Sequence, residues 1–236
     1  MKLSIVVPFY NEEKNVHLVL DAFSKFYTKY DFELICVNDG SKDATAQIFE
    51  EERSKNKYPF AKFISYTPNG GYGNAIMTGV RTTDGEVVSW THSDMQTDPA
   101  DVFKAFDMFQ RLNNEKVIVK GVRIKRPLPQ IILSYGMAVI ASVILRKCMY
   151  EINAQPKLFH RNFIPKLDNA PKDFSLDLYL INLAKQLNYE VRTIPVEFKN
   201  RLHGSSSWGG SFKNRIKTIW RTIKYVWGLK SQKQKN

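Results

Sequence analysis

Residues 3–13, LSIVVPFYNEE, are the stretch from which the fold can be predicted. The run 3–7 is apolar on both faces and rich in Val and Ile, which is typical of a buried strand in the middle of a parallel sheet. Asn11 can cap a following helix whose first turn carries two acids. The apolar face of that helix comprises Val16, Val19, Leu20, Phe23 and Phe26. The stretch therefore predicts a strand, a loop and a helix in succession.

The same alternation continues along the first half of the sequence. Strands are predicted at 32–37, 61–66, 86–90 and 116–120, with helices between them at 44–51, 74–81 and 99–112. Strands that alternate with helices through short loops imply right-handed crossovers, and hence an α/β fold with an open, mostly parallel sheet flanked by helices. Ligands bind such sheets beyond the carboxyl ends of the strands, so we expect the functional site there.

The second half of the sequence is less regular. Residues 130–147 contain the apolar run IILSYGMAVIASVIL, which is shorter than the roughly 20 residues that a membrane span needs. We therefore expect a buried or interfacial helix, followed by a helix over 175–187 and a strand over 190–198. The expected division of the chain is a domain over 1–210, with halves 1–121 and 122–210, and a tail over 211–236.

The formal net charge is +12, and the basic residues are concentrated near the C-terminus. Residues 198–236 carry ten Lys or Arg and no acidic residue, which leaves +2 for residues 1–197. Within 211–228 an apolar face with two tryptophans adjoins a strongly basic remainder, the pattern of a helix that lies on an anionic membrane surface. The alternative is packing on the domain or self-association into a homo-oligomer. No nucleic-acid motif accompanies the charge, so nucleic acid is not an expected partner.

The cysteines and the N-terminal residues indicate the compartment. Cys36 and Cys148 lie in apolar surroundings without the spacing of a metal site, which suits a reducing environment. The apolar stretch 3–9 is too short for the core of a signal peptide. We therefore expect a cytoplasmic protein.

Two polar clusters follow the first three predicted strands. Pro8, Tyr10 and Glu12 come after the first strand and Asp39 after the second, where an aromatic face and carboxylates could hold a base and a ribose. The alternative is that Asn11 only caps a helix and Asp39 only turns the chain. The glycine-rich loop 70–73 could direct backbone N–H groups at a phosphate, although it matches neither the Rossmann nor the Walker pattern.

A third polar cluster, SWTHSDMQTDP at 89–99, follows the fourth predicted strand. His92, Asp94 and Gln96 can project to one side of an extended chain. Carboxylate and amide oxygens suit Mg²⁺ or Mn²⁺ held chiefly by substrate phosphates, and imidazole is acceptable to Mn²⁺. The alternative is a polar turn in which Asp98 and Pro99 start a helix.

Five segments together resemble family 2 glycosyltransferases of the GT-A fold, in order and in spacing, over about residues 3–210. The likeness is greatest to the polyprenyl-phosphate sugar transferases, of the dolichyl-phosphate mannosyltransferase type. The segments are SIVVPFYNEEKNV (4–16), ELICVNDGSKDAT (33–45), NGGYGNAIMTGV (69–80), HSDMQTDP (92–99) and VEFKNRLHGSSSW (196–208). Singly these motifs are loose, whereas five in register are specific.

The resemblance implies a role for each matching residue. The nucleotide-sugar would be held by Pro8, Tyr10, Glu12, Asp39, Gly71 and Ser93, and its phosphates would contact Lys120, Arg123 and Arg201. Asp94 and Gln96 would bind Mg²⁺ or Mn²⁺, with His92 standing where the family usually has Asp. Asp177 is the carboxylate that could act as a base toward an acceptor; the alternative is a solvated helix residue. Asp94, Asp177 and Arg201 are the expected catalytic residues.

The resemblance also implies the reaction, a metal-assisted and inverting transfer from a nucleotide-sugar to a lipid-linked acceptor, most simply polyprenyl phosphate. A phosphate acceptor is already anionic, whereas a saccharide hydroxyl would need a base such as Asp177. Transfer to a glycan or glycolipid hydroxyl is therefore the alternative, and a non-catalytic nucleotide-sugar-binding or scaffold protein is a third. We expect the protein to lie on the cytoplasmic face of a membrane, attached through 211–228.

Overall fold

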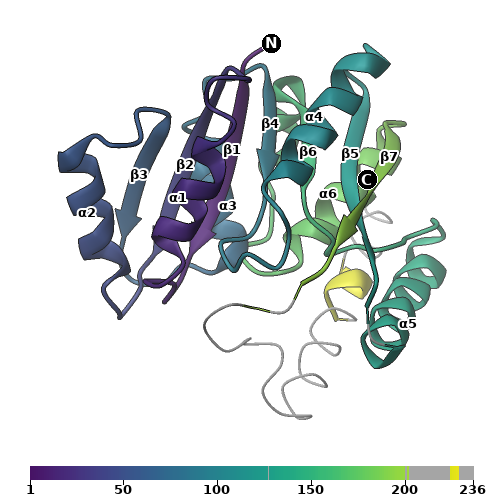
Figure 1. The fold of residues 1–236 in the computed structure, drawn as a ribbon. Coiled ribbons are helices and arrows are strands. Elements are labelled where there is room, and N and C mark those ends of the chain that lie inside the picture. Colours follow the sequence, from purple (N-terminus) through teal and green to yellow (C-terminus); the bar gives the residue numbers. More distant parts are fainter. Residues whose placement is uncertain (127, 200, 202–223, 229–236) are drawn as a thin grey trace.

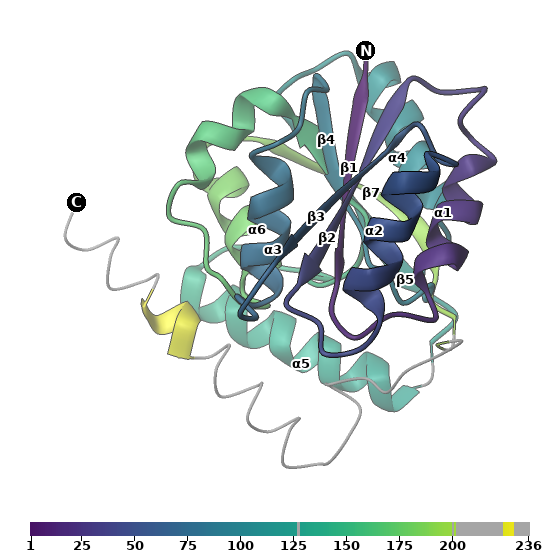
Figure 2. The ribbon, with the colours of Figure 1, turned by 90° about the vertical axis from the view of Figure 1, so that its left-hand side faces the viewer.

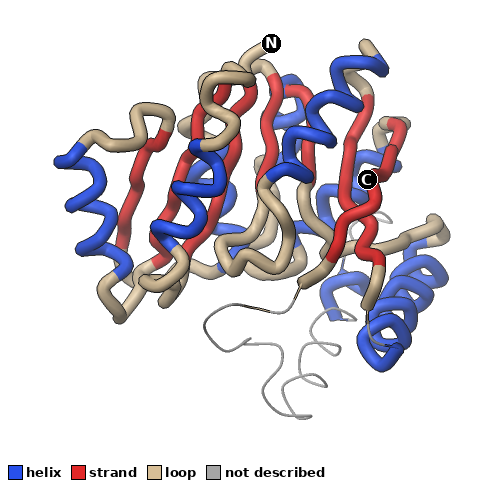
Figure 3. Tube along the Cα trace, viewed as in Figure 1, coloured by secondary structure: helices blue, strands red, loops and turns tan. Residues whose placement is uncertain are grey.

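Seven strands lie side by side in one twisted sheet with helices on both faces (Figures 1 and 3). The computed structural model describes residues 1–126, 128–199, 201 and 224–228. The strands are β1 (Leu3–Phe9), β2 (Phe32–Asp39), β3 (Ala61–Tyr66), β4 (Val87–Trp90), β5 (Val117–Ile124), β6 (Lys157–His160) and β7 (Glu190–Glu197). The helices are α1 (Val16–Ser24), α2 (Thr45–Lys55), α3 (Tyr72–Val80), α4 (Ala100–Leu112), α5 (Leu128–Leu145), the 3₁₀ helix η1 (Arg161–Leu167) and α6 (Leu176–Gln186).

The strand order is β3-β2-β1-β4-β6-β5-β7, and the sheet is mostly parallel, as predicted. The exception is β6, which runs antiparallel to both β4 and β5. Neither β6 nor η1 was predicted, because four residues that begin with Lys157 and end with His160 carry no periodic pattern. Their strand is defined by long-range pairing with β4 and β5, which local sequence does not contain.

The loop after β1 differs from the prediction. Asn11 does not cap α1, which begins at Val16, and its backbone φ of 55° lies in the left-handed region. Its side-chain oxygen accepts a hydrogen bond from the backbone N–H of Lys42 at 2.8 Å, and its own N–H donates to Ser41 Oγ at 2.9 Å. Asn11 therefore joins the loop after β1 to the loop after β2, since its short polar side chain tolerates this backbone conformation.

Two cores lie on opposite faces of the sheet, because successive side chains of each strand point to opposite sides. Ile5 and Val7 of β1 face the core beneath α1, α2 and α4, whereas Val6 faces the core beneath α3 and α6. Figure 2 shows α3 and α6 on one side of the sheet and α1 and α2 on the other. This packing fixes the strands, so that the loops at their carboxyl ends have defined positions.

The third apolar cluster joins α5 to the rest of the domain. Ala138 and Ala141 on α5 pack with Leu178 and Ile181 of α6 and with Val226. Val226 belongs to the predicted amphipathic tail, of which only 224–228 fall among the described residues; the rest of 211–236 lies outside them. Within the described part of the chain, no helix combines the length and the apolarity that crossing a membrane requires.

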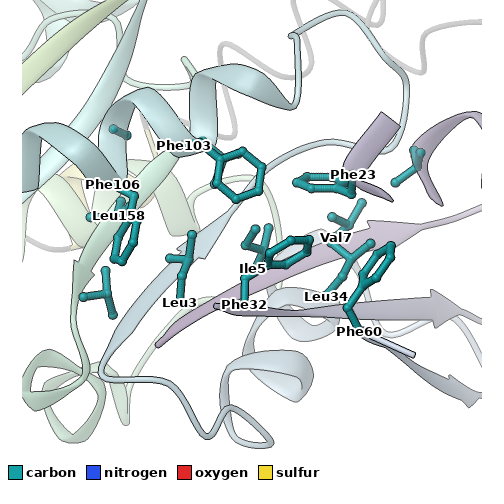
Figure 4. Close-up of a cluster of buried hydrophobic side chains, with 14 of the residues drawn as sticks. Leu3, Ile5, Val7, Phe23, Phe32, Leu34, Phe60, Phe103, Phe106 and Leu158 are labelled. Atoms are coloured by element: carbon teal, nitrogen blue, oxygen red, sulfur yellow. The ribbon is translucent and has the colours of Figure 1, made fainter. Parts of the chain in front are cut away.

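Phe103 is the aromatic residue at the centre of the first core (Figure 4), and its removal should be costly. Its ring is stacked on Phe26 and Tyr30, with centroids 4.3 and 4.6 Å apart, and meets Phe32 edge-on. We expect Phe103→Ala to lower the free energy of unfolding by about 3–5 kcal/mol, measured by urea denaturation, because the cavity cannot fully collapse. The control is Leu187→Ala, which shortens a partly exposed side chain. If Phe103→Ala lowered the free energy of unfolding by less than about 1 kcal/mol, no more than the control does, this packing would be contradicted.

Candidate active site

The predicted site residues gather at the carboxyl ends of the parallel strands, which form the lower edge of the sheet in Figure 1. Pro8 and Asp39 are the last or near-last residues of β1 and β2, and the segment 91–99 continues directly from β4. Pairing of β1 with both β2 and β4 brings these loops together. The expectation that the site lies beyond the carboxyl ends of the strands matches this arrangement.

Arg201 joins three of the predicted site residues. Its Nη2 lies 2.8 Å from Asp94 Oδ2, its Nη1 lies 3.7 Å from Glu12 Oε1, and its Nε donates to Gln96 Oε1 at 3.2 Å. Gln96 donates in turn from its side-chain amide to the carbonyl of Lys199 at 3.1 Å. The segment after β7 is thereby held against the loops that follow β1 and β4.

The surroundings of Arg201 combine buried negative charge with a guanidinium. Asp94 is buried, and burial raises the pKa of Glu12 above its ordinary value, although Asn15 and Arg201 oppose this rise. Asp94 Oδ1 accepts the backbone N–H of Gln96 at 3.1 Å, which fixes the orientation of the carboxylate. A carboxylate and an amide oxygen beside a guanidinium can bind a cation and an anionic phosphate group at adjacent points.

His92 lies near Asp94 and Arg201. Its ring also faces that of Tyr72, with the two centroids 5.8 Å apart. Burial lowers the pKa of His92 below its ordinary value, and this effect outweighs the opposing influence of Asp94 and Asp177. The imidazole is therefore neutral at neutral pH, the form that can ligate a metal. The neighbouring Ser93 is buried.

The donor set fits a divalent ion that is held mainly by substrate phosphates. Among the residues that the structure describes, no group of three His, Cys, Asp or Glu forms a complete metal cluster. Mg²⁺ and Mn²⁺ sites in enzymes of phosphate compounds commonly use one or two carboxylates, with phosphates and water supplying the other ligands. Asp94, with the oxygen of Gln96 and the nitrogen of His92 nearby in the chain, is suited to that kind of site.

Asp39 accepts hydrogen bonds from the glycine-rich loop that precedes α3. Its Oδ1 accepts from Tyr66 Oη and the N–H of Gly70, both at 2.7 Å, and its Oδ2 accepts from Asn69 Nδ2 at 2.9 Å and the N–H of Gly71 at 3.0 Å. Gly71 has φ 95°, and a Cβ there would lie 2.6 Å from the carbonyl oxygen of Lys172. Asp39 therefore fixes the position of the loop 69–71, and it also lies at the edge of the site itself.

The two remaining residues of the first motif differ in exposure. Pro8 is partly exposed at the end of β1, and Tyr10 is 44% exposed. An exposed aromatic face just beyond β1 has the chemistry to pack against a base, and a carboxylate of the site could accept a hydrogen bond from a ribose.

Asp177 is a buried carboxylate whose two oxygens both have partners. It is 2% exposed, so the alternative that it is a solvated helix residue is wrong. Oδ1 accepts from Trp90 Nε1 at 3.0 Å and lies 3.5 Å from Lys157 Nζ. Oδ2 accepts from Gln155 Nε2 at 3.0 Å and from Tyr72 Oη at 3.4 Å. Both oxygens are thus engaged by partners from β4, α3, β6 and the segment that precedes β6.

Two buried lysines lie near Asp177, and Arg123 pairs with Glu151. Lys157 is fully buried and donates to the carbonyl of Ala154 at 2.6 Å, and burial lowers its pKa despite the attraction of Asp177. Lys120 is 3% exposed, and burial lowers its pKa to about 7. Arg123 Nε lies 2.7 Å from Glu151 Oε2. The predicted phosphate contacts Lys120 and Arg123 therefore belong to a region where basic side chains outnumber the two carboxylates of Asp177 and Glu151.

Four residues of this region, Trp90, Gln155, Lys157 and Glu151, were not predicted from the sequence. Only Lys157 could have been noticed in the sequence: it is a single charged residue beside the apolar pair Leu158 and Phe159, and a charge is unusual in a buried strand. Gln155 and Glu151 lie in an irregular segment whose pattern predicts nothing about burial. Only the tertiary fold brings them next to residues distant in sequence.

Comparison with known proteins identifies relatives of the kind that the motifs predicted. A family model described as glycosyl transferase family 2 matches residues 4–173. The dolichyl-phosphate beta-glucosyltransferase of Dictyostelium discoideum is 25% identical over 97% of this chain and 77% of that protein. The protein of the same name from Homo sapiens is 25% identical over 100% and 80%. The undecaprenyl-phosphate 4-deoxy-4-formamido-L-arabinose transferase of Pseudomonas fluorescens is 38% identical over 42% of this chain and 30% of that protein.

Solved structures of glucosyl-3-phosphoglycerate synthase from Mycobacterium tuberculosis have the same fold. The complex with Mn²⁺, UDP-glucose and phosphoglyceric acid matches with a TM-score of 0.72 at 18% identity, covering 97% of this chain and 79% of that one. The complex with Mg²⁺ and UDP matches with a TM-score of 0.69 at 17% identity, over the same shares. At these identities the likeness concerns the fold alone. Since the family model covers well over half of the chain, the protein belongs to glycosyl transferase family 2 and is a glycosyltransferase.

Proposed function

We propose that the protein transfers a sugar, with inversion, from a nucleotide-sugar to the phosphate of a polyprenyl phosphate. The observation that carries this proposal is the state of Asp177, whose two oxygens are both engaged by buried donors. A hydroxyl acceptor requires a base that takes its proton, and a carboxylate so engaged is poorly available for that role. A phosphate acceptor is already ionised and needs no base.

The charges around Asp177 favour the same acceptor. Lys120, Lys157 and Arg123 bring positive charge to this side of the site, against the carboxylates of Asp177 and Glu151. Lys120, with a pKa of about 7, can gain a proton when an anion approaches. The names of three relatives, which refer to dolichyl-phosphate and undecaprenyl-phosphate, agree with a phosphate acceptor that is carried by a polyprenyl lipid.

On the donor side, we assign the nucleotide to the loops after β1, β2 and β4. This assignment covers Pro8, Tyr10, Glu12, Asp39, Gly71 and Ser93. Arg201 would contact the diphosphate, toward which its guanidinium can turn from Asp94 and Glu12. An oxygen of the acceptor phosphate attacks the anomeric carbon as the bond to the diphosphate oxygen breaks, and the electron pair of that bond leaves with the diphosphate. Attack from the opposite face inverts the configuration.

Mg²⁺ or Mn²⁺ would be held by Asp94 and the side chains of Gln96 and His92, together with the donor phosphates. When bound, the ion stabilises negative charge on the departing diphosphate. Asp94 is oriented for this role by the backbone N–H of Gln96, and His92 is neutral at neutral pH. Solved relatives of the same fold contain Mn²⁺ or Mg²⁺ with UDP, which agrees with this proposal.

The membrane is the expected location of a polyprenyl acceptor, and we retain the cytoplasmic face as the proposed side. Residues 211–228 remain the proposed basic contact with anionic lipid, although most of them lie outside the described residues. Within 224–228, Val226 is buried against the domain, whereas Trp227 is about half exposed.

Asp177→Asn separates the two kinds of acceptor. We expect transfer to polyprenyl phosphate to fall less than about tenfold, because the loss of a general base costs roughly 10²–10⁴-fold and Asp177 is not one. The melting temperature should fall, since the charge of Lys157 loses its buried partner. Glu33→Gln is the matched control. Glu33 is also buried and also pairs with a lysine, Lys62 at 2.7 Å, but it lies at the amino end of β2, away from the site.

The measurement is steady-state transfer at temperatures well below each melting point, across a range of pH. If Asp177→Asn lost activity by more than about a hundredfold and Glu33→Gln did not, Asp177 would be a base and the hydroxyl acceptor would be favoured.

Asp94→Ala tests the proposed ion contact. With a panel of nucleoside diphosphates, the wild-type melting temperature should rise further when Mn²⁺ or Mg²⁺ is added, because ligands that bind only the folded state stabilise it by mass action. Asp94→Ala should lose this metal-dependent rise. The control Asp98→Ala, which removes an exposed carboxylate four residues away, should keep it. Equal metal-dependent rises in Asp94→Ala and the wild type would contradict the assignment.

A further inference from the structure

The outward side of α5 is apolar and exposed. Seven large apolar side chains there have 37–72% of their surface exposed: Leu128, Ile131, Ile132, Tyr135, Val139, Ile140 and Val143. We call these seven residues the α5 outer face. The opposite side of α5 is buried through Ala138 and Ala141, which pack on α6 and Val226. The packing of Ala138 and Ala141 fixes the rotation of the helix about its axis, so the apolar side is held facing outward.

Basic residues flank α5 at both ends, and the helix itself carries no acidic residue. Residues 124–150 contain Lys125, Arg126, Arg146 and Lys147 and no Asp or Glu. Arg126 is buried with Glu151, and Lys125 also pairs with Glu197, but Arg146 is exposed at the end of the helix. Tyr150, just beyond that end, is 49% exposed. An apolar face with basic ends and exposed tyrosines is the pattern of a helix that lies in the interface of an anionic membrane.

The position of α5 relates this face to the site. The helix follows directly from the carboxyl end of β5, and both views place it beyond that end of the sheet (Figures 1 and 2). The site is built from loops at the same end of β1, β2 and β4. If α5 lies on a flat surface, the loops of the site are therefore close to that surface as well.

We propose that the α5 outer face binds the surface of an anionic lipid bilayer, with its apolar side chains among the headgroups and its basic ends at lipid phosphates. This inference goes beyond the contact assigned to the tail, and it deepens the proposed function by giving the site access to a phosphate carried by a lipid. It rests on the proposed function only for that access, since binding to lipid requires neither donor nor acceptor.

A second copy of the chain is a poorer occupant for this face. In a two-fold symmetric pairing, the same surface patch meets itself. Two antiparallel α5 helices would bring the basic end at Lys125 of one copy toward the basic end at Arg146 of the other, and α5 itself carries no acidic residue that could pair with either. Anionic phospholipid headgroups supply negative charge that attracts these basic ends.

The double variant Ile132→Glu/Val143→Glu tests the proposal, because both side chains are more than half exposed and their loss should not disturb the fold. The matched control is Tyr27→Glu/Leu187→Glu, which changes two exposed apolar residues by the same charge. Tyr27 precedes β2 and Leu187 precedes β7, so both lie at the amino end of the sheet. Full-length proteins are sedimented with vesicles of phosphatidylcholine containing about a third phosphatidylglycerol.

We expect the wild type and the control to bind these vesicles within about twofold of each other, and the α5 double variant to bind at least about tenfold more weakly. Melting temperatures should stay close to the wild-type value. Binding by the α5 variant that equalled the wild type, or an equal loss in the control, would overturn the proposal. A wild-type dimer that the α5 variant alone dissociates, with vesicle binding unchanged, would assign the face to a second copy instead.

A fluorophore on Cys148 gives a second readout. Cys36 is fully buried and burial raises its pKa, whereas Cys148 is exposed just beyond α5, so a thiol-reactive dye should label Cys148 selectively in the folded protein. Its emission should shift to shorter wavelength on vesicles in the wild type and not in the α5 variant. Because neither readout involves sugar transfer, vesicle binding without activity would count against the proposed function alone, and activity without vesicle binding would count against this inference alone.

Discussion

The structure of the site depends on the buried interactions of the Asp177 carboxylate. Trp90 of β4, Tyr72 of α3, Lys157 of β6 and Gln155 just before β6 all approach it. One side chain of α6 therefore ties together elements from both halves of the chain. A buried charge is tolerable only with such partners, because an unpaired one carries a large desolvation penalty. The same partners make Asp177 better suited to organising the site than to removing a proton.

The donor side depends on a second convergence, in which Arg201 contacts Asp94, Glu12 and Gln96. The parallel pairing of β1 with β2 and β4 brings the loops of these strands to one edge, and the segment after β7 then supplies the guanidinium. Positive charge from Arg201 stands on the proposed diphosphate side, and positive charge from Lys120, Lys157 and Arg123 on the proposed acceptor side. Two separate cationic regions suit a reaction between two phosphate-bearing substrates.

Much of this arrangement could be predicted from the sequence, because the apolar runs, their spacing and the polar clusters after the strands are local signals. The strand at 3–7 and the site residues at its end are examples. The antiparallel β6 could not, since its four residues form a strand only by pairing with β4 and β5. The burial of Asp177 was missed because Trp90 and Gln155 are 87 and 22 residues away in sequence. The helix expected over 130–147, buried or interfacial, matches α5 in position, yet the structure was needed to show which of its sides is exposed.

The central claim, that the acceptor is a phosphate and that no carboxylate removes a proton from it, can be tested most directly with two matched lipids. Polyprenyl phosphate and the free polyprenol of equal chain length are each incubated with a nucleotide-sugar panel and Mn²⁺, and the products are identified by mass spectrometry. The account predicts sugar linked to the polyprenyl phosphate and none linked to the polyprenol. Transfer to the polyprenol, or to an added saccharide, at a rate that equals or exceeds transfer to the phosphate would contradict it.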